Sequence, residues 1–261
     1  MVIKDQAVCV RVIDYSETSQ IVTLWTRDHG KLSAIAKGAK RSTSAFDGPI
    51  ELFSYGGAVY HESTRDGLST LVEFQQTSDL VMQIPKDLFS YHGALLATEL
   101  LVRLTQEQDA HPNLYGIYLQ FLRDICDVST SPADAPRLSL LILFELNLLK
   151  EIGLSLVLSR CVNCEQDRPL HWADIFLSHA AHGFVCRDCE MNFPERVYLS
   201  KEVGRCLAHL PSLITAGLDT LRLVEKHLID HFTYLLHREP RTAKFVLQDK
   251  RHPLGTPYNN L

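Results

Sequence analysis

The sequence lacks any apolar run long enough to cross a membrane. Its longest apolar stretch, Leu138 to Leu149, is interrupted by polar residues and is shorter than the roughly 20 residues that a bilayer-spanning helix needs. The chain reaches Lys4 and Asp5 without a continuous apolar segment, so its start does not have the form of a secretory signal. We therefore expect a cytoplasmic protein that makes no contact with a membrane.

An excess of positive charge is also missing. The 261-residue chain has 26 Lys and Arg against 31 Asp and Glu, which gives a net charge of −5. Proteins that bind nucleic acid indiscriminately are usually basic overall, so any DNA contact must come from a local basic patch. With 46% hydrophobic and 22% charged residues, the chain has the composition of a globular protein with a substantial core.

The usual signatures of catalysis are absent as well. The sequence contains no His-Glu-x-x-His, no Gly-x-Ser-x-Gly and no Gly-x-Gly-x-x-Gly, which are typical of zinc proteases, α/β-hydrolases and dinucleotide-binding enzymes. The segment from Gly38 to Ser42 is not a phosphate-binding loop, because it lacks the upstream glycine and the Gly-Lys-Ser order. We expect that the protein is not an enzyme.

The first 80 residues have the pattern of short β-strands. Runs rich in β-branched and aromatic residues alternate with Asp/Gly turns, which favours an all-β barrel or sandwich. The strand runs are 6–15, 19–26, 30–36, 51–62 and 68–77. Their number fits an OB-fold, although a small SH3-like barrel would give a similar pattern. We predict that residues 1–80 form an OB-fold domain that binds nucleic acid.

Helical periodicity replaces the strand pattern after Pro85. The predicted helices are 86–107, 113–128, 138–152, 201–209 and 218–237. The third is apolar on every side, so we expect it inside the helical body. The predicted organisation is α+β and multidomain, with a helical domain at 81–159 and 193–248, a cysteine-bearing insertion at 160–192, and a C-terminal tail at 249–261.

The strongest motif is a pair of Cys-x-x-Cys sequences. Cys161 and Cys164 form one pair, Cys186 and Cys189 form the other, and 21 residues separate them. Zinc takes four thiolate or imidazole ligands at tetrahedral corners, and a full set of thiolates leaves no open position for catalysis. The spacing predicts a structural Zn²⁺ in a zinc-ribbon-like hairpin. Reduced, unmetallated cysteines or a redox pair are the alternatives.

The residues around these pairs allow further predictions. His171-Trp172 and Gly183-Phe184 are plausible strands of the hairpin. His171, His179 and His182 lie between the two cysteine pairs. One of these histidines could replace a thiolate ligand, but we expect them at the surface. The other cysteines have apolar neighbours, and we expect small buried side chains rather than nucleophiles. They are Cys9, Cys126 and Cys206.

A basic segment follows the predicted second strand. Lys31, Lys37, Lys40 and Arg41 fall within eleven residues, and a barrel strand with a cationic exit loop suits a nucleic-acid backbone. Arg11 and Arg27 could widen this patch. The possible stacking rings are Trp25, Phe46, Phe53 and Tyr55. An ordinary solvated face, with the rings in the core, is the competing interpretation.

The segment from Asp14 to Arg41 closely resembles the N-terminal signature of the RecO family. It contains Tyr15-Ser16-Glu17 and later Gly30-Lys31-Leu32, and it ends in Ala36-Lys37-Gly38-Ala39-Lys40-Arg41. The similarity continues at residues 48–54 and 67–71. It returns at 144–149 and 153–154, just before the cysteine pairs. The order of barrel, helices, cysteine site and helices also resembles the family's architecture.

This resemblance implies a function in DNA repair and recombination. RecO-like proteins bind single- and double-stranded DNA and anneal complementary strands. They act with RecR, bind the C-terminal tail of single-strand-binding protein, and help to load RecA in the RecF pathway, in the bacterial cytosol near the nucleoid. Lys31, Lys37, Lys40 and Arg41 occupy the motif's basic positions, and the cysteine pairs match the zinc ligands of many members.

One departure from the family pattern bears on the strength of DNA binding. Many members carry further basic residues after this block, whereas here the chain continues Ser42-Thr43-Ser44-Ala45-Phe46-Asp47. With the acidic net charge, this departure leads us to expect that DNA binding depends on RecR. The acidic charge also favours the alternative function, a non-catalytic adaptor with incidental DNA contact. The pocket for the acidic tail should combine an apolar hollow with Lys or Arg, and Arg123, Lys150 and Arg222 are candidates among the helices.

Overall fold

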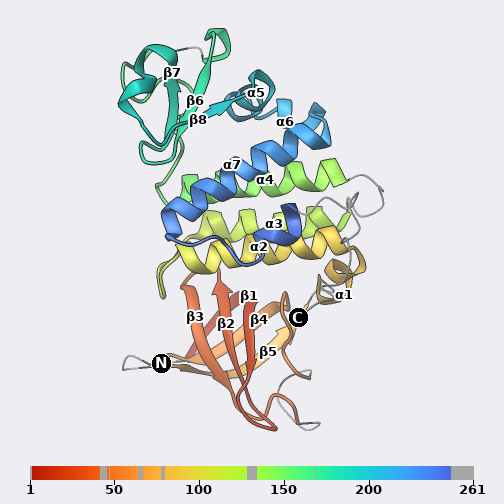
Figure 1. Ribbon diagram of the computed structural model, residues 1–261. Helices are drawn as coiled ribbons and strands as arrows, with labels where there is room; N and C mark the ends of the chain where they lie inside the picture. The colour runs from red at the N-terminus through yellow and green to blue at the C-terminus, as the bar shows by residue number, and fades with distance from the viewer. Residues whose placement is uncertain are drawn as a thin grey trace, which may run out of the picture.

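The computed structural model describes residues 2–41, 46, 48–63, 67–77, 80–127, 134–167 and 169–247. The predicted tail at 249–261 lies outside the described residues, as does most of the stretch from Ser42 to Asp47. An N-terminal barrel, a body of packed helices and a small cysteine-bearing sheet follow one another along the long axis of the molecule (Figure 1).

The N-terminal strands close into a barrel. The strands are β1 (Val2–Asp14), β2 (Gln20–Thr26), β3 (Gly30–Ala36), β4 (Tyr55–His61) and β5 (Ser69–Gln76). They follow one another around the barrel in the order β1-β2-β3-β5-β4. β3 and β5 are parallel and the other pairs are antiparallel. This order is that of an OB-fold, so the predicted fold of this domain is confirmed and an SH3-like barrel is excluded.

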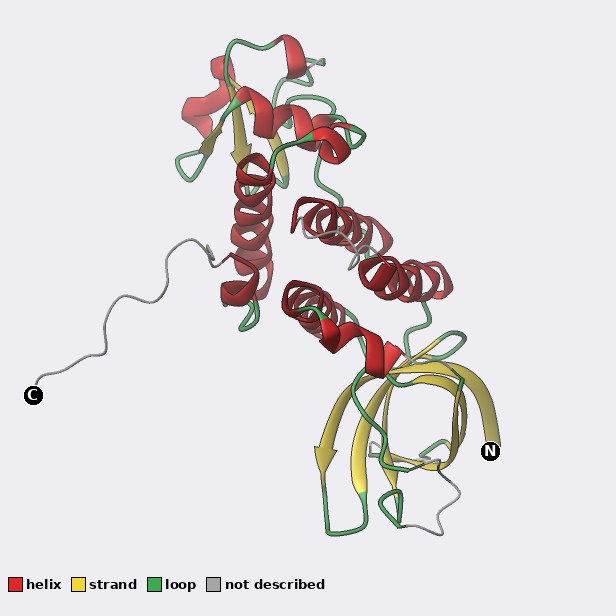
Figure 2. Cartoon of the chain, turned by 90° about the vertical axis from the view of Figure 1, so that its right-hand side faces the viewer, coloured by secondary structure: helices red, strands yellow, loops and turns green. Residues whose placement is uncertain are grey.

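The length of β1 allows the barrel to close. Its first half pairs with β4 and its second half pairs with β2. The register shifts between Cys9 and Arg11, and such a bulge bends a strand and increases its twist. Figure 2 shows the strands curling around a common axis, with the helices at one end of the barrel.

The middle of β1, from Ala7 to Val10, is buried on both faces, and successive side chains of a strand point to opposite sides. Ala7 and Cys9 lie inside the barrel, in an apolar core with Leu24, Leu32 and other inward residues. Val8 and Val10 face the helices instead and belong to the main core. Trp25 and Phe53 extend that core from the barrel side. The barrel wall is therefore also one wall of the helical core.

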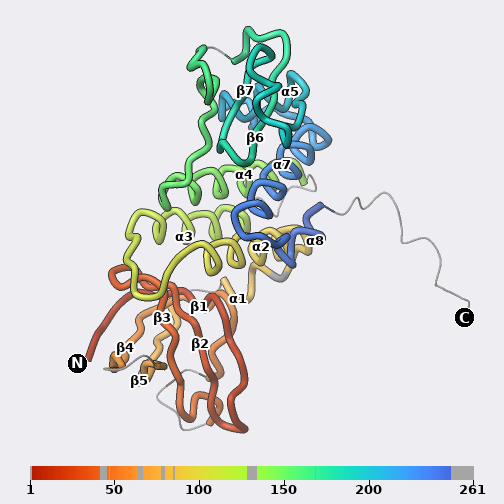
Figure 3. The backbone as a smooth tube through the Cα atoms, turned by 60° about the vertical axis from the view of Figure 1, so that its left-hand side comes forward, coloured from red at the N-terminus to blue at the C-terminus, as the bar shows by residue number. Residues whose placement is uncertain are grey.

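The helical body contains four of the predicted long helices, now α2 (Leu88–Leu104), α3 (Pro112–Asp127), α4 (Asp134–Glu151) and α7 (Leu218–Leu236). It also contains the short helices α1 (Leu80–Gln83) and α8 (Ala243–Leu247), which the sequence did not predict, and a short 3-10 turn, η1 (Ile84–Lys86). α4 packs against α2, α3 and α7, as expected for the most apolar segment (Figure 3). No helix in the described part of the chain is both long and apolar enough to cross a membrane.

The cysteine-bearing unit is inserted between α4 and α7. Its elements are η3 (Pro169–His171), β6 (Ile175–Ser178), β7 (Gly183–Cys186), η4 (Arg187–Asn192), β8 (Val197–Leu199), α5 (Lys201–Ala208) and α6 (Ser212–Thr215). β6 lies between β7 and β8. The prediction of a strand at His171-Trp172 is wrong. His171 ends a 3-10 turn, and the strand forms instead at Ile175–Ser178, where the sequence becomes apolar.

The start of β3 joins the barrel to the helices. The Nζ of Lys31 donates to the carbonyl oxygens of Val102, at 2.7 Å, and Thr105, at 2.5 Å. Both carbonyls belong to the C-terminal end of α2, where carbonyls lack partners within the helix and attract cations. Next to Lys31, a Cβ on Gly30 would lie 1.9 Å from the carbonyl oxygen of Asp109. This approach explains why a glycine occupies the position.

A pair of buried carboxyl groups joins α4 to α7. Glu145 and Glu225 are fully buried, and no other described group donates to any of their four carboxyl oxygens. Burial raises the pKa of Glu225 to about 8, against a smaller opposing effect of its hydrogen bond with Glu145. Burial, and then the charge of Glu225, raise the pKa of Glu145 well above its usual value. Near neutral pH the pair therefore holds at least one proton, which bridges the two groups.

Replacement of Glu225 by Gln should make the folding stability less sensitive to alkaline pH. The folded state keeps Glu225 protonated up to about pH 8, whereas the unfolded state loses this proton near pH 4.5. The folded protein is therefore most stable below about pH 4.5, relative to the unfolded state, and it loses this stability as the pH rises through about 8. The Glu225→Gln variant cannot ionise at this position, so it should gain at least about 1.4 kcal/mol over the wild type between pH 5 and pH 8.5. Denaturant unfolding across this range measures the difference. Glu202→Gln, on the surface of α5, is the control, and parallel profiles for wild type and E225Q would contradict the shared proton.

Candidate DNA-binding surface and metal site

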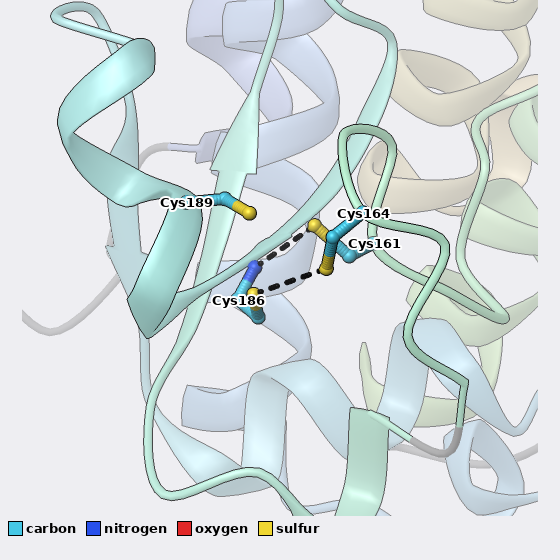
Figure 4. A group of neighbouring side chains, drawn as sticks. All are labelled: Cys161, Cys164, Cys186 and Cys189. Atoms are coloured by element: carbon cyan, nitrogen blue, oxygen red, sulfur yellow. Dashed lines mark hydrogen bonds between the residues drawn. The ribbon is translucent and has the colours of Figure 1, made fainter.

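The two cysteine pairs meet in space and form a cluster that can hold a metal ion. The sulfur atoms of Cys161, Cys164, Cys186 and Cys189 all lie within 4.8 Å of one another. Cys161 and Cys164 come from one tight loop, Cys186 ends β7, and Cys189 lies on η4, with the sulfurs facing each other (Figure 4). The prediction that these residues form one site is therefore supported by their geometry.

The distances and hydrogen bonds fit tetrahedral thiolate coordination. The sulfurs of Cys164 and Cys186 are 3.7 Å apart, and Zn–S bonds of about 2.3 Å place sulfurs at tetrahedral corners about 3.8 Å apart. The backbone N–H of Cys186 donates to the sulfur of Cys161, and the amide of Asn163 donates to the sulfur of Cys189. Burial raises the pKa of Cys161, but hydrogen bonds from surrounding backbone N–H groups outweigh burial and lower it to about 7. Such donors stabilise thiolates, the form that binds metals.

Three of the predicted DNA-contacting cations lie together at the far end of the barrel. Lys37 and Arg41 are exposed and Lys40 is half-buried, in the turn that follows β3 and contains Gly38 with φ of 71°. β3 begins at the helices, so its length places this turn about 20 Å away from them. We call Lys37, Lys40, Arg41 and the neighbouring β1–β2 turn the barrel tip.

The barrel tip is only weakly cationic. Lys40 forms a 2.6 Å ion pair with Asp14, and its hydrogen bond to that carboxyl holds the pKa of Asp14 below its usual value. The backbone N–H of Lys40 also donates to the carbonyl of Thr18, so the β1–β2 turn and the basic turn are fastened together. Lys37 and Arg41 form no ion pair in the part of the tip that the structure describes, so they carry its remaining positive charge.

The other predicted cations lie elsewhere. Lys31 is 9% exposed and its ammonium is occupied by α2, so it cannot reach a DNA backbone. The strand alternation places Lys31 away from the barrel interior, but the helices cover that face. Arg27 is exposed and pairs with Asp28 at the helix-proximal end of the barrel. Arg11 lines a groove between β1 and α2. The predicted six-residue patch is therefore not continuous.

The rings considered for base stacking are mostly in the core. Trp25 and Phe53 are almost fully buried and Phe46 is 8% exposed. Tyr55 is half-buried, with the guanidinium of Arg123 5.7 Å from its ring centroid. Sequence reasoning missed Tyr15, which is 64% exposed in the β1–β2 turn of the barrel tip. The sequence signal for its exposure was its position at the end of a strand, directly before the polar residues Ser16 and Glu17.

A groove rich in arginine lies between the barrel and the helices, with a volume of 480 Å³. Its apolar wall is formed by Val10, Leu52, Leu95 and Val102, and its polar groups come from Arg11, Thr98, Glu99, Arg103, Arg238, Arg241 and Thr242. We call this the arginine groove. Glu99 accepts hydrogen bonds from the backbone N–H groups of Arg241 and Thr242 and from the Thr242 hydroxyl, and it pairs with Arg103.

The remaining arginines give the groove its charge. In the part of the chain that the structure describes, no ion pair involves Arg11, Arg238 or Arg241. The candidates suggested by the sequence do not line this groove. Arg222 pairs with Asp219, and Arg123 packs over Tyr55. The missed signal was the pair of arginines flanking Pro240, directly after the last long helix.

Comparison with known proteins assigns the chain to a family. A family model described as Recombination protein O N terminal matches residues 1–78, and one described as Recombination protein O C terminal matches residues 85–241. The chain belongs to the RecO family. The resemblance carried by the N-terminal signature is thus confirmed, and membership in this family identifies a DNA repair protein.

Curated RecO proteins from several bacteria are similar over most of the chain. The DNA repair protein RecO of Bacillus pumilus (strain SAFR-032) is 34% identical over 207 residues, which cover 79% of this chain and 76% of the relative. That of Bacillus subtilis (strain 168) is 30% identical over 211 residues, covering 79% and 76%. That of Listeria monocytogenes serotype 4b (strain CLIP80459) is 28% identical over 204 residues, covering 78% and 75%.

Removal of metal from the cysteine cluster should lower the stability of this RecO-family chain. An ion present at 100 times its Kd stabilises the fold by about 2.7 kcal/mol, which corresponds to roughly 5–11 °C in Tm for a protein of this size. We expect this loss after chelation verified by metal analysis, and also in Cys186→Ser before chelation. Cys206→Ser, a buried cysteine outside the cluster, should keep its response to the chelator. An unchanged Tm after verified metal removal would contradict a structural ion.

Proposed function

We propose that this RecO-family chain is a recombination mediator without catalytic activity. In this proposal it binds single- and double-stranded DNA, anneals complementary strands, and acts with RecR to help load RecA onto DNA coated by single-strand-binding protein. The observation that carries the proposal is the OB-fold barrel, which presents Lys37, Arg41 and the exposed ring of Tyr15 on one tip. OB-folds bind single strands by combining cationic grooves with aromatic stacking.

The barrel tip supports a mode of binding that ignores base sequence. Lysine and arginine neutralise phosphates and release counterions, and Tyr15 offers a face on which any base can stack. Annealing then requires no bond-making chemistry, because it depends on screening the repulsion between two strands while they are held close. The Asp14–Lys40 pair reduces the charge of the tip, which favours modest affinity for DNA and a contribution from RecR.

We further propose that the cysteine cluster holds a structural Zn²⁺. Cys161, Cys164, Cys186 and Cys189 supply four sulfur donors, and structural zinc is typically four-coordinate with such ligands. The ion would supply cross-links between the loop at Cys161, the end of β7 and η4. Because the protein ligands fill the coordination shell, this site supports a role in folding.

The arginine groove is our candidate site for the acidic C-terminal tail of single-strand-binding protein. An apolar wall can take a terminal hydrophobic side chain, while Arg11, Arg238 and Arg241 can bind carboxylates through charge-assisted hydrogen bonds. The groove borders the barrel, so a tail bound there would bring the coated strand next to the OB-fold. This placement supports delivery of the coated strand to the barrel without a conformational change.

Loss of the two unpaired cations of the barrel tip should weaken DNA binding and its salt dependence. Each lost phosphate contact flattens the slope of log K against log salt by roughly 0.7–0.9, so Lys37→Ala/Arg41→Ala should reduce it by about 1.4–1.8. Fluorescence anisotropy of labelled single-stranded DNA at several salt concentrations measures this slope. Lys201→Ala/Arg205→Ala, on the exposed side of α5, removes the same charge from the opposite end of the molecule. If the two double variants have equal slopes of log K against log salt, the barrel tip is not part of the DNA-binding site.

Measurement with and without RecR separates the proposal from the adaptor alternative. Salt-dependent binding by the chain alone supports the barrel as the DNA site. Binding that requires RecR keeps the mediator function and moves the main DNA surface to the complex. If neither sample binds DNA, an adaptor that contacts only proteins becomes the better explanation.

Truncation of the arginines in the arginine groove should weaken binding of an acidic peptide. Hydrogen bonds to charged groups contribute about 1.5–3 kcal/mol each. Arg238→Ala/Arg241→Ala should therefore lower the affinity for a labelled tail peptide of single-strand-binding protein by at least about 10-fold. The truncation leaves the backbone N–H of Arg241, which binds Glu99, in place. Titration by fluorescence anisotropy gives the affinity, and K201A/R205A serves again as the control. The groove is not the tail site if the two variants lose affinity equally.

A further inference from the structure

A cluster of histidines joins the cysteine-bearing sheet to the helical body. His179 and His182 lie in the turn between β6 and β7, and His227 and His231 lie on α7. The ring centroids of His231 and His179 are 5.6 Å apart, and those of His231 and His182 are 5.3 Å apart. The expectation that His179 and His182 are surface residues is therefore wrong for His179, which is 9% exposed, and His182 is half-buried.

Six of the eight ring nitrogens of this cluster are buried without hydrogen-bond partners in the described part of the chain. Both ring nitrogens of His179 and of His231 lack a partner, and so do the Nδ1 atoms of His182 and His227. His231 is fully buried. A buried polar atom without a partner costs free energy, and in a native protein it indicates a missing water or ion. Imidazoles that are grouped around His231 and have unpartnered nitrogens can supply lone pairs to one shared ion.

The spacing of the rings fits coordination of one ion. Zn–N bonds of about 2.0–2.1 Å at tetrahedral angles place the centroids of two bound imidazoles about 5 Å apart, close to both measured separations. His227 and His231 are one turn apart on the same face of α7, a spacing that brings two side chains together. Turning the rings of His179 and His231 toward an ion would break no hydrogen bond of their nitrogens in the described part of the chain.

The surroundings also favour a cation. Burial has the larger effect on the pKa of His179 and lowers it, which disfavours the charged form and leaves the neutral imidazole that binds metals. The carboxylates of Asp230 and Glu195 act in the opposite direction, and negative charge near a cation site is favourable. The turn itself is held in shape, because the Oγ of Ser178 accepts from the backbone N–H of Ala181 and bonds to Glu195. The backbone N–H of Val157 donates to the carbonyl of His182 at 2.8 Å. The backbone that carries the two turn histidines therefore needs little rearrangement.

We propose that His179, His182 and His231 bind a second divalent transition-metal ion, Zn²⁺ in the first place, with His227 adjacent to complete its shell. Imidazole nitrogens are preferred ligands of zinc and its neighbours. β7 separates this turn from Cys186 by three residues, about 10 Å along a strand, so the site is distinct from the cysteine cluster. The ion would fasten the β6–β7 hairpin to α7.

Native mass spectrometry with saturating Zn²⁺ tests the site by the number of ions per chain. The wild type should bind one ion more than His179→Ala/His182→Ala, whether or not the cysteine cluster is filled. The control His171→Ala/His237→Ala changes exposed histidines outside the cluster and should bind as many ions as the wild type. Equal numbers for the wild type and the H179A/H182A variant would overturn the proposal.

A spectroscopic titration distinguishes the two sites. Addition of Co²⁺ to the zinc-loaded chain should give absorption of a nitrogen-ligated ion without a sulfur-to-metal charge-transfer band, and this absorption should be lost in H179A/H182A. Should the double variant fail to fold, His182→Ala alone, which changes only a half-buried ring, should weaken Co²⁺ binding by at least 10-fold. Unchanged binding in His182→Ala, or a sulfur-type band in the wild type, would refute the assignment.

Discussion

The ammonium group of Lys31 at the end of α2 determines how the barrel and the helices are related. It donates to two carbonyls that α2 leaves without partners, and a cation at a helix C-terminus also interacts favourably with the helix dipole. Burial lowers the pKa of Lys31, and the charge of Glu107 opposes that shift. A charged group held in this way tolerates few other positions, so the barrel has one orientation on the helical body.

The apolar core extends this constraint through the rest of the molecule. Trp25 and Phe53 of the barrel belong to the same buried cluster as α4 and as Phe184 of the cysteine-bearing sheet. Because this core is continuous, the elements between the barrel and the sheet have little freedom to move independently. The barrel tip and the arginine groove, our two candidate binding surfaces, are both carried on this continuous framework.

The distribution of charge explains how an acidic protein can offer sites to anions. The net charge of −5 describes the whole chain, whereas a ligand responds to charges within about 10 Å at moderate salt. Lys37 and Arg41 at the tip, and Arg238 and Arg241 in the groove, are local concentrations of positive charge on separate surfaces. Each surface also contains a carboxylate that organises it, Asp14 in one case and Glu99 in the other.

Local patterns in the sequence were sufficient to predict the barrel strands, the long helices, the central place of α4 and the four-cysteine cluster. These features depend on short-range rules, because strand alternation, helical periodicity and the Cys-x-x-Cys spacing are set by neighbouring residues. Whether a given side chain is exposed to solvent depends instead on segments that are distant in the sequence. Lys31 in β3 and Lys37 in the turn directly after it looked equivalent in the sequence, but α2 covers only Lys31.

The arginine groove and the histidine cluster likewise bring together residues that are far apart in the chain. Arg11 and Arg238 line one groove between the barrel and the helices, and His179 lies beside His231 because the β6–β7 hairpin folds back onto α7. The amino-acid sequence by itself determined the barrel strands, the long helices, the family and the four-cysteine cluster. The tertiary structure decided which cations and histidines are exposed, paired or gathered, because burial and pairing depend on long-range contacts that no local pattern encodes.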